Sequence, residues 1–178
     1  MKNMFLSCPR GEYKKSFENY ILAYKRKNDI HYFNIYKNGL EDFYSYINYL
    51  NNLSKGIDIP EGWVSTSTFW LIDNEEVVGV VRVRHEEVST AGHIGYDISP
   101  CYRNKGYGTQ ILRLALVEAK KIGLKEVIVT CNIDNIASRK IIEKNNGELL
   151  GTVFDEEENE TLYRYNLTRG LGVSPFPF

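Results

Sequence analysis

The chain of 178 residues is long enough for one domain with a hydrophobic core and too short for two domains of ordinary size. Its fractions of apolar residues, 43%, and of charged residues, 25%, are those of a globular protein. The formal net charge of −1 gives no electrostatic bias toward nucleic acid or an acidic membrane surface, so we expect neither as a partner.

Two further features narrow the class of protein. The longest apolar runs are far shorter than the roughly 20 residues that span a membrane, and the N-terminal segment becomes charged before a signal-peptide core develops. Cys8, Cys101 and Cys131 are too few and too widely spaced for a disulfide framework or a CxxC metal site. We therefore expect a cytoplasmic protein with reduced thiols and no bound metal.

The first third of the chain has helical periodicity. Apolar side chains between Tyr13 and Tyr24 recur at helical spacing, opposite lysine and glutamate side chains. A second amphipathic stretch over Leu40–Leu53 stops at Gly56, a residue type that commonly ends helices. Pro60 and Gly62 then indicate a loop.

The pattern changes to strands at Ser65. Thr66–Ile72 and Val77–Arg84 are rich in β-branched and aromatic residues and are separated by a turn, so they predict an antiparallel hairpin. Glu86–Gly92 is predicted to be a polar loop and His93–Ser99 a third strand.

The rest of the chain alternates between helices and strands. The predicted elements are a helix over Gly108–Ile122 that ends at Gly123, a strand over Glu126–Cys131, a helix over Ile136–Lys144, two strands over Leu149–Phe154 and Thr161–Leu167 around the acidic turn Asp155–Asn159, and a loose tail over Gly170–Phe178. Together they predict a single α/β domain over residues 1–178, with a helical region over 1–64, a core with a mixed sheet over 65–168 and a tail over 169–178.

A strand, a basic glycine-bearing loop and an amphipathic helix follow one another between Ile94 and Lys121. Gly106 and Gly108 allow the backbone to approach a ligand closely, because no Cβ intervenes. The first amides of the helix have no partner inside it, and with the positive end of the helix dipole they form a receptor for phosphate. This order of elements therefore indicates a phosphate-binding site.

The spacing of the loop excludes two common phosphate-binding motifs. The Walker pattern G-x-x-x-x-G-K-[ST] is absent, and Ile111 stands where a dinucleotide fingerprint has its third glycine. What fits is R-x-x-G-x-G, from Arg103 to Gly108. In this motif the chain resembles the GNAT N-acetyltransferase superfamily, whose pattern is Q/R-x-x-G-x-G/A after a strand and at the start of a helix.

A second segment strengthens this resemblance. N-x-A-S-R-K-I-I-E-K-N-N-G, over Asn135–Gly147, looks like the family's second coenzyme-binding segment, in the variant of the branch that acetylates protein N-termini. The resemblance covers about Ser65 to Leu167. It implies a GNAT-like mixed, mostly antiparallel central sheet of six to seven strands flanked by helices, with residues 1–64 on the acceptor side.

The resemblance also implies acetyl-CoA as the co-substrate. The pantetheine arm would lie between the strand ending at Ile98 and the strand ending at Cys131, and the pyrophosphate on the amides of Arg103–Thr109. Asn135 and Ser138 would face the coenzyme arm, and a helix-capping role for Asn135 can coexist with this one. The coenzyme-binding residues so implied are Ile98, Arg103, Asn104, Lys105, Gly106, Tyr107, Gly108, Thr109, Asn135 and Ser138.

Acetyl transfer to an amine needs a neutral amine, a donor for the developing oxyanion and a proton for the leaving thiolate. The resemblance implies that the oxyanion donor is a backbone N–H near Ile98. By strand periodicity Tyr96 shares the face of Ile98, where relatives often carry the base, whereas His93 and Asp97 lie on the other face. Tyr96 is therefore a candidate catalytic side chain.

The other acid–base candidates are less defined. His85 and Glu86, at the end of the preceding strand, either reach the site or are ordinary exposed polar residues. Ile142 stands where many relatives have a proton-donating tyrosine, so the thiolate leaves unassisted, through water, or with help from another group. Tyr102 and Tyr107 are near in sequence but are disfavoured for this role.

Three function hypotheses follow. The first is an acetyl-CoA-dependent N-acetyltransferase that moves an acetyl group to a primary amine of a small molecule or peptide by direct attack on the thioester. The second, motivated by Ile142 and the weak base on the Tyr96 face, is a non-catalytic acyl-CoA-binding or sensing domain. A flavodoxin-like or Rossmann phosphate module ranks last, because the hairpins are antiparallel. An acyl-cysteine on Cys101 or Cys131 is disfavoured against apolar packing.

Three features bear on partners. The aromatic helices of residues 1–64 would cover the acceptor site. The acidic turn Asp155–Glu160 either attracts a cationic acceptor or is a solvated hairpin tip. The final strand and the tail, if exposed, could pair two copies into a homodimer.

Overall fold

The computed structural model describes residues 4–172. Its first half contains β1 (Phe5–Ser7), the 3-10 helix η1 (Gly11–Tyr13), α1 (Lys14–Arg26), α2 (Ile30–Tyr36), α3 (Asn38–Glu41), α4 (Phe43–Ser54), β2 (Thr66–Asp73) and β3 (Glu76–Val88). Its second half contains β4 (Gly92–Ile98), η2 (Pro100–Tyr102), α5 (Tyr107–Ile122), β5 (Ile128–Asn132), α6 (Ile136–Lys144), β6 (Glu148–Asp155), β7 (Glu160–Asn166) and η3 (Thr168–Gly172).

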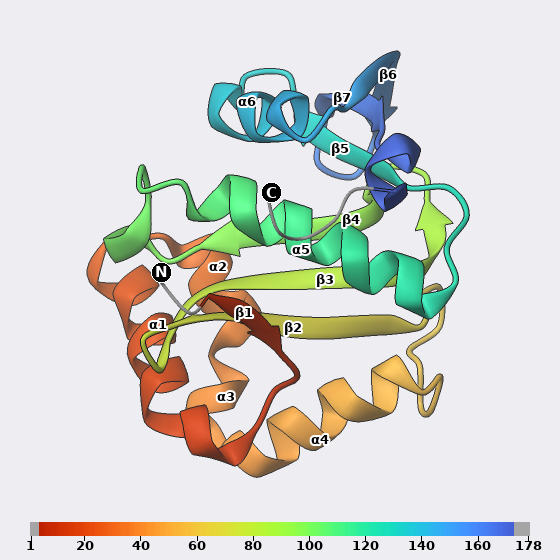
Figure 1. Ribbon diagram of the computed structural model, residues 1–178. Coiled ribbons are helices and arrows are strands. Elements are labelled where there is room, and N and C mark those ends of the chain that lie inside the picture. The colour runs from red at the N-terminus through yellow and green to blue at the C-terminus, as the bar shows by residue number, and fades with distance from the viewer. Residues whose placement is uncertain (1–3, 173–178) are drawn as a thin grey trace.

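The strands form two antiparallel sheets, one in the order β1-β2-β3-β4 and one in the order β5-β7-β6. β4 and β5 lie next to each other where the two sheets meet (Figure 1). The predicted α/β class, with a mostly antiparallel sheet flanked by helices, is confirmed. The single mixed sheet of the prediction is divided into a four-stranded and a three-stranded part.

Helices cover both faces of the four-stranded sheet (Figure 1). On one face α5 buries side chains such as Ile111 against Val81 of β3. On the other face α1–α4 build an aromatic cluster, in which the rings of Phe17 and Trp70 stack with their centroids 4.2 Å apart. Burial of this apolar surface is the main favourable term for the fold.

Three local predictions were wrong. Glu86–Val88, predicted as a loop, extends β3, and the short helices α2 and α3 were not predicted. The second predicted helix begins at Phe43 instead of Leu40, because Asp42 is extended and its side chain accepts the N–H of Ser45 at 3.1 Å. An aspartate in this position caps a helix and so fixes where the helix starts.

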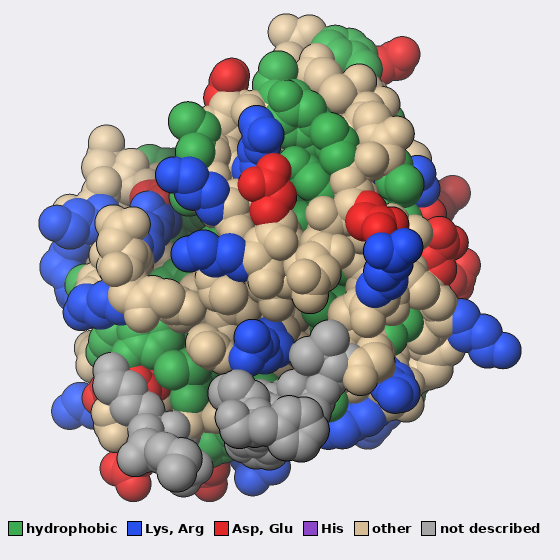
Figure 2. All heavy atoms as spheres, turned by 45° about the horizontal axis from the view of Figure 1, so that its top comes forward, with side chains coloured by type: hydrophobic (Ala, Val, Ile, Leu, Met, Phe, Trp, Pro, Cys, Tyr) green, Lys and Arg blue, Asp and Glu red, His purple; other side chains and the backbone are tan. Residues whose placement is uncertain are grey.

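The final strand does not form a sheet edge, so the prediction that it could pair two copies of the chain is wrong. β7 lies between β5 and β6, and β6 is the edge strand. Leu149, Leu150 and Phe154 of β6 are exposed, and Figure 2 shows hydrophobic side chains gathered at this end of the molecule. Residues 170–172 of the predicted loose tail belong to η3, and residues 173–178 lie outside the described residues.

None of the helices in the described part of the chain is long and apolar enough to cross a lipid bilayer.

Candidate functional site

The junction of the two sheets opens into a cavity. At the start of β4, His93 Nδ1 accepts the N–H of Ile128, and a Cβ on Gly92 would lie 2.5 Å from the Ile128 carbonyl oxygen. Gly92 therefore permits a backbone contact that no other residue type could make. Farther along β4, the residues Tyr96–Ile98 line a cavity of about 650 Å³.

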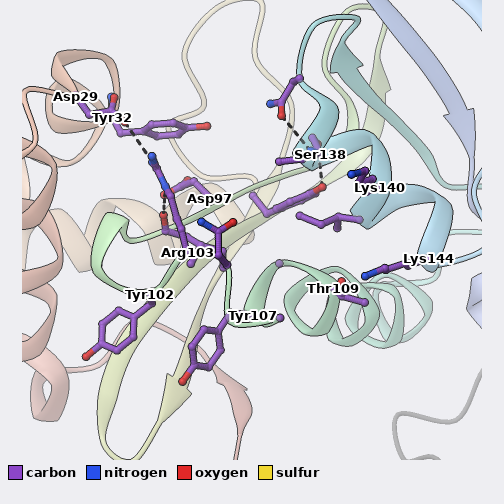
Figure 3. A pocket seen from close by; sticks show the side chains of 18 residues that line it. Asp29, Tyr32, Asp97, Tyr102, Arg103, Tyr107, Thr109, Ser138, Lys140 and Lys144 are labelled. Carbon is purple, nitrogen blue, oxygen red and sulfur yellow. Dashed lines mark hydrogen bonds and ion pairs between the residues drawn. The ribbon is translucent and has the colours of Figure 1, made fainter.

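Besides β4, three other parts of the chain wall this cavity (Figure 3). Asp29 and Tyr32 come from the start of α2, the loop before α5 contributes Tyr102–Asn104, and α6 contributes Ser138. All of the predicted coenzyme residues line the cavity except Lys105, whose Nζ instead donates to the Cys101 carbonyl oxygen at 3.3 Å. The structure thus brings together two sequence segments that lie about thirty residues apart.

The first turn of α5 faces the cavity with its backbone. Gly106 precedes the helix with φ of +85°, in the left-handed region, and a Cβ placed there would meet no atom within 4 Å. Gly106, Gly108 and Thr109 line the cavity. Since the first amides of a helix lack partners inside it and carry partial positive charge, this wall suits an anion.

The basic side chains at the cavity differ in what they contact. Arg103 Nε donates to the Ile98 carbonyl oxygen at 3.1 Å, and its Nη2 pairs with the Asp29 carboxylate at 3.2 Å. Arg103 therefore ties the loop to β4 and to the start of α2. Lys140 and Lys144 reach the cavity from α6 (Figure 3), and Figure 2 shows basic side chains gathered on this side of the molecule.

The two glycines of the motif serve different purposes. Gly106 leaves space open toward the cavity, whereas Gly108 is buried against α6. A Cβ on Gly108 would lie 2.4 Å from Ile141 Cδ1. A side chain at Gly108 would therefore disturb the packing of α5 on α6 before it reached a bound ligand.

Tyr96 and Ser138 meet in the cavity. Asn135 caps α6 by accepting the N–H of Ser138 at 3.0 Å, which fixes the start of that helix. The hydroxyls of Tyr96 and Ser138 are 2.9 Å apart. Burial raises the pKa of the Tyr96 hydroxyl above its ordinary value, so this group stays protonated at neutral pH.

The backbone of β4 presents Ile98 to the cavity. Ser99 N–H donates to the Val78 carbonyl oxygen of β3 at 3.0 Å. Alternate residues of a strand direct their backbone groups to opposite edges, so the N–H of Ile98 is directed away from β3, toward the cavity.

Other sequence candidates lie elsewhere. His85 and Glu86 are outside the cavity lining, and the Nε2 of His85 is 2.9 Å from the Ser67 hydroxyl. Ile142 is fully buried in the core, and it is its neighbour Ile141 that lines the cavity. Burial raises the pKa of the Cys131 thiol, which disfavours a nucleophilic thiolate.

A second cavity of about 480 Å³ adjoins the first, since Tyr32 lines both. Its walls come from α2, the loop before β2, and β3. Sequence reasoning did not identify this lining, because α2 was not predicted and the other residues come from separate segments that only the fold brings together. The lining consists of His31, Tyr32, Ile35, Gly62, Trp63, Val64, Thr66, Arg82, Arg84, Val88 and Ala91.

A buried polar network centred on Asp97 lies between α1, α2 and β4. Its carboxylate accepts hydrogen bonds from three tyrosine hydroxyls, those of Tyr20, Tyr24 and Tyr36, and pairs with Arg82 at 3.2 Å. Burial raises the pKa of these hydroxyls well above the ordinary value, so they remain donors. Asp97 faces away from Tyr96, as strand periodicity predicts.

Within residues 4–172, no group of three or more histidine, cysteine, aspartate or glutamate side chains is arranged to hold a metal ion.

Comparison with known proteins agrees with this geometry. The family model described as an acetyltransferase (GNAT) domain matches residues 20–148. No curated protein matches the chain.

Several solved structures share the fold. Mycobacterium smegmatis RimJ in complex with CoA-disulfide has a TM-score of 0.73 at 14% identity, over 97% of this chain and 85% of that one. RimL, the ribosomal L7/L12 α-N-protein acetyltransferase, in complex with coenzyme A has a TM-score of 0.68 at 17% identity, over 92% of each chain. The microcin C7 self-immunity acetyltransferase MccE with acetyl-CoA and AMP has a TM-score of 0.67 at 18% identity, over 92% of this chain and 91% of that one.

Proposed function

The chain belongs to the GNAT acetyltransferase family, and we propose that it is an N-acetyltransferase that uses acetyl-CoA and a primary amine of a small molecule or peptide. The observation that carries this proposal is the glycine-bearing start of α5, where Gly106, Gly108 and Thr109 line a cavity at the junction of the two sheets. The cytoplasm is its expected location.

The residues of the first cavity fit acetyl-CoA. The amides of Gly108 and Thr109 would hold the pyrophosphate, and Lys140 and Lys144 would neutralise further phosphate charge at the rim. The open edge of β4 would pair with the pantetheine amides, as an added strand does. When bound, acetyl-CoA supplies an acetyl group activated as a thioester.

The chain's own groups would then handle charge and protons. The N–H of Ile98, directed to the open edge of β4, would donate to the developing oxyanion. Tyr96 Oη, kept protonated by burial and positioned by Ser138, would donate a hydrogen bond to the leaving sulfur, which departs as the thiolate. This assignment replaces the tyrosine that is missing at position 142.

Tyr96→Phe is expected to lower kcat about 100-fold, a typical contribution of a positioned hydrogen-bond donor to developing charge. The measurement is steady-state kinetics with the best amine substrate, together with the Kd of acetyl-CoA, which should change little. Ser138→Ala is the matched control, since it removes only the partner hydroxyl and should reduce kcat less. A kcat that stays within about twofold of wild type in Tyr96→Phe would exclude this role.

His31 is the candidate proton acceptor for the attacking amine. It lies at the start of α2 in the second cavity, with its ring 5.0 Å from the ring of Tyr32, and histidine is the side chain that most often acts as a general base. His31→Gln is expected to lower kcat/KM about 10-fold near neutral pH and less at alkaline pH, where amines with a pKa near 10 lose their proton unaided. Superimposable pH–rate profiles for the two proteins would contradict it.

For the acetyl acceptor we propose a chemical class, a primary amine, and not a particular molecule. RimL is described as an acetyltransferase of a ribosomal protein, and the MccE structure holds AMP beside acetyl-CoA, so the molecules bound or modified by proteins of this fold are diverse. For this chain the second cavity, joined to the first at Tyr32, is the proposed acceptor site.

The direct test is release of CoA thiol from acetyl-CoA in the presence of a broad panel of primary amines and short peptides, with mass spectrometry of the acetylated product. Turnover with at least one amine supports the proposal. Saturable binding of acetyl-CoA without turnover over the whole panel would instead favour a non-catalytic acyl-CoA-binding or sensing domain.

A further inference from the structure

The second cavity contains two guanidinium groups side by side. Arg82 and Arg84 lie on the same face of β3 and extend over Gly95 of β4. The position of a Cβ on Gly95 would be 3.5 Å from Arg84 Nη2 and 3.8 Å from Arg82 Nε. Both guanidinium groups therefore lie within van der Waals distance of the same point on β4.

The two arginines differ in their partners. Arg82 pairs with the Asp97 carboxylate at 3.2 Å and donates to the Tyr36 hydroxyl at 2.7 Å. Arg84 Nη1 donates to the Ala91 carbonyl oxygen at 3.1 Å. No carboxylate in the described part of the chain forms an ion pair with Arg84.

A cation in this position is unfavourable without an anion. Burial, and the charge of Arg82 beside it, lower the pKa of Arg84 to about 10, so the group is still charged at neutral pH. Guanidinium presents several N–H donors in a plane, and one backbone carbonyl satisfies only part of them. The remaining donors suit a carboxylate or a phosphate, which bind guanidinium in pairs of hydrogen bonds.

The other walls of the cavity are apolar. Trp63 is 61% exposed and Ile35 is 41% exposed although both line a cavity, and Val64 and Val88 add further apolar surface. Large apolar side chains that remain accessible in a concave site are typical of ligand contacts.

We propose that the acceptor carries an anionic group, a carboxylate or a phosphate, which pairs with Arg84 while its apolar part contacts Trp63. That the bound anion is the acetyl acceptor rests on the proposed function. That an anion binds at Arg84 can be tested by binding measurements alone. It narrows the acceptor from any primary amine to an amine with a negative charge.

The test uses matched pairs of probes. Ala-Phe is compared with Ala-Phe amide, which differs in the carboxylate, and phosphoethanolamine with ethanolamine, which differs in the phosphate. The wild type is expected to prefer the anionic member of at least one pair about 10-fold or more, both in Kd by calorimetry and in kcat/KM. The pair that shows the preference identifies the anion.

Variants then assign the preference to Arg84. Arg84→Met, which removes the charge and keeps the length, should abolish the preference without changing the Kd of acetyl-CoA. Arg84→Lys should retain part of it. Arg169→Met, which removes an exposed charge outside both cavities, is the matched control and should behave as wild type.

Two results would overturn the inference: equal affinity for both members of each pair, or a preference that Arg84→Met retains. Absence of saturable binding for every anionic probe would overturn it as well. If the anionic probes bind through Arg84 but no amine is acetylated, the proposed function fails while the anion site stands.

Discussion

Gly106→Asp is expected to raise the Kd of acetyl-CoA about 100-fold, which corresponds to about 2.7 kcal/mol. Gly106→Asn is expected to raise it less than about 10-fold. The two side chains have the same shape, and both tolerate the left-handed backbone of Gly106, φ +85°, better than other residue types. A Cβ there meets no atom within 4 Å, so the Cβ of neither variant clashes with the protein.

The difference between the two variants is charge. A carboxylate at the start of α5 would repel a pyrophosphate at a distance of a few ångströms. Any backbone strain at φ +85° is common to both variants, so it does not contribute to the difference between them. Calorimetric titration of both variants and thermal unfolding of the free proteins separate binding from stability. Equal Kd values for the two variants would place the pyrophosphate away from Gly106.

Asp97→Ala is expected to lower the free energy of unfolding by about 3 to 5 kcal/mol, the usual effect of removing one partner of a buried ion pair. It leaves Arg82 without its carboxylate and deprives three buried tyrosine hydroxyls of their acceptor. Asp97→Asn should cost less, because an amide oxygen still accepts hydrogen bonds.

Denaturant unfolding monitored by far-UV circular dichroism measures these differences. Asp42→Ala is a suitable reference, since it removes an exposed aspartate that caps α4 and should lower stability less than Asp97→Ala does. If Asp97→Ala costs no more than this helix cap, the Asp97 network does not hold α1 and α2 on β4.

The coenzyme loop could be predicted from the sequence because its physics is local. A glycine pair, a basic residue and a following helix are adjacent in the chain. Glycine allows close approach of the backbone, and the start of a helix binds anions, whatever the rest of the fold is. The face of β4 that carries Tyr96 also follows from a period of two residues. The packing of Gly108 against α6 could not be predicted, because Ile141 contacts it from a helix more than thirty residues later in the chain.

The acceptor side could not be predicted, because it depends on contacts between distant segments. α2 has only seven residues, so its periodicity is weak, although Asp29 before it is a residue type typical of helix starts. Arg82 and Arg84 look equivalent in the sequence. Only the fold brings Asp97 to Arg82 and leaves Arg84 bonded to a backbone carbonyl oxygen.

If the amides at the start of α5 hold the pyrophosphate of acetyl-CoA, the coenzyme should protect them from solvent. Amide hydrogen exchange followed by mass spectrometry, with and without saturating acetyl-CoA, measures this directly. Slower exchange is expected in peptides covering residues 103–110 and 95–99, with smaller changes in α4. Unchanged exchange over 103–110 at saturating acetyl-CoA would contradict it.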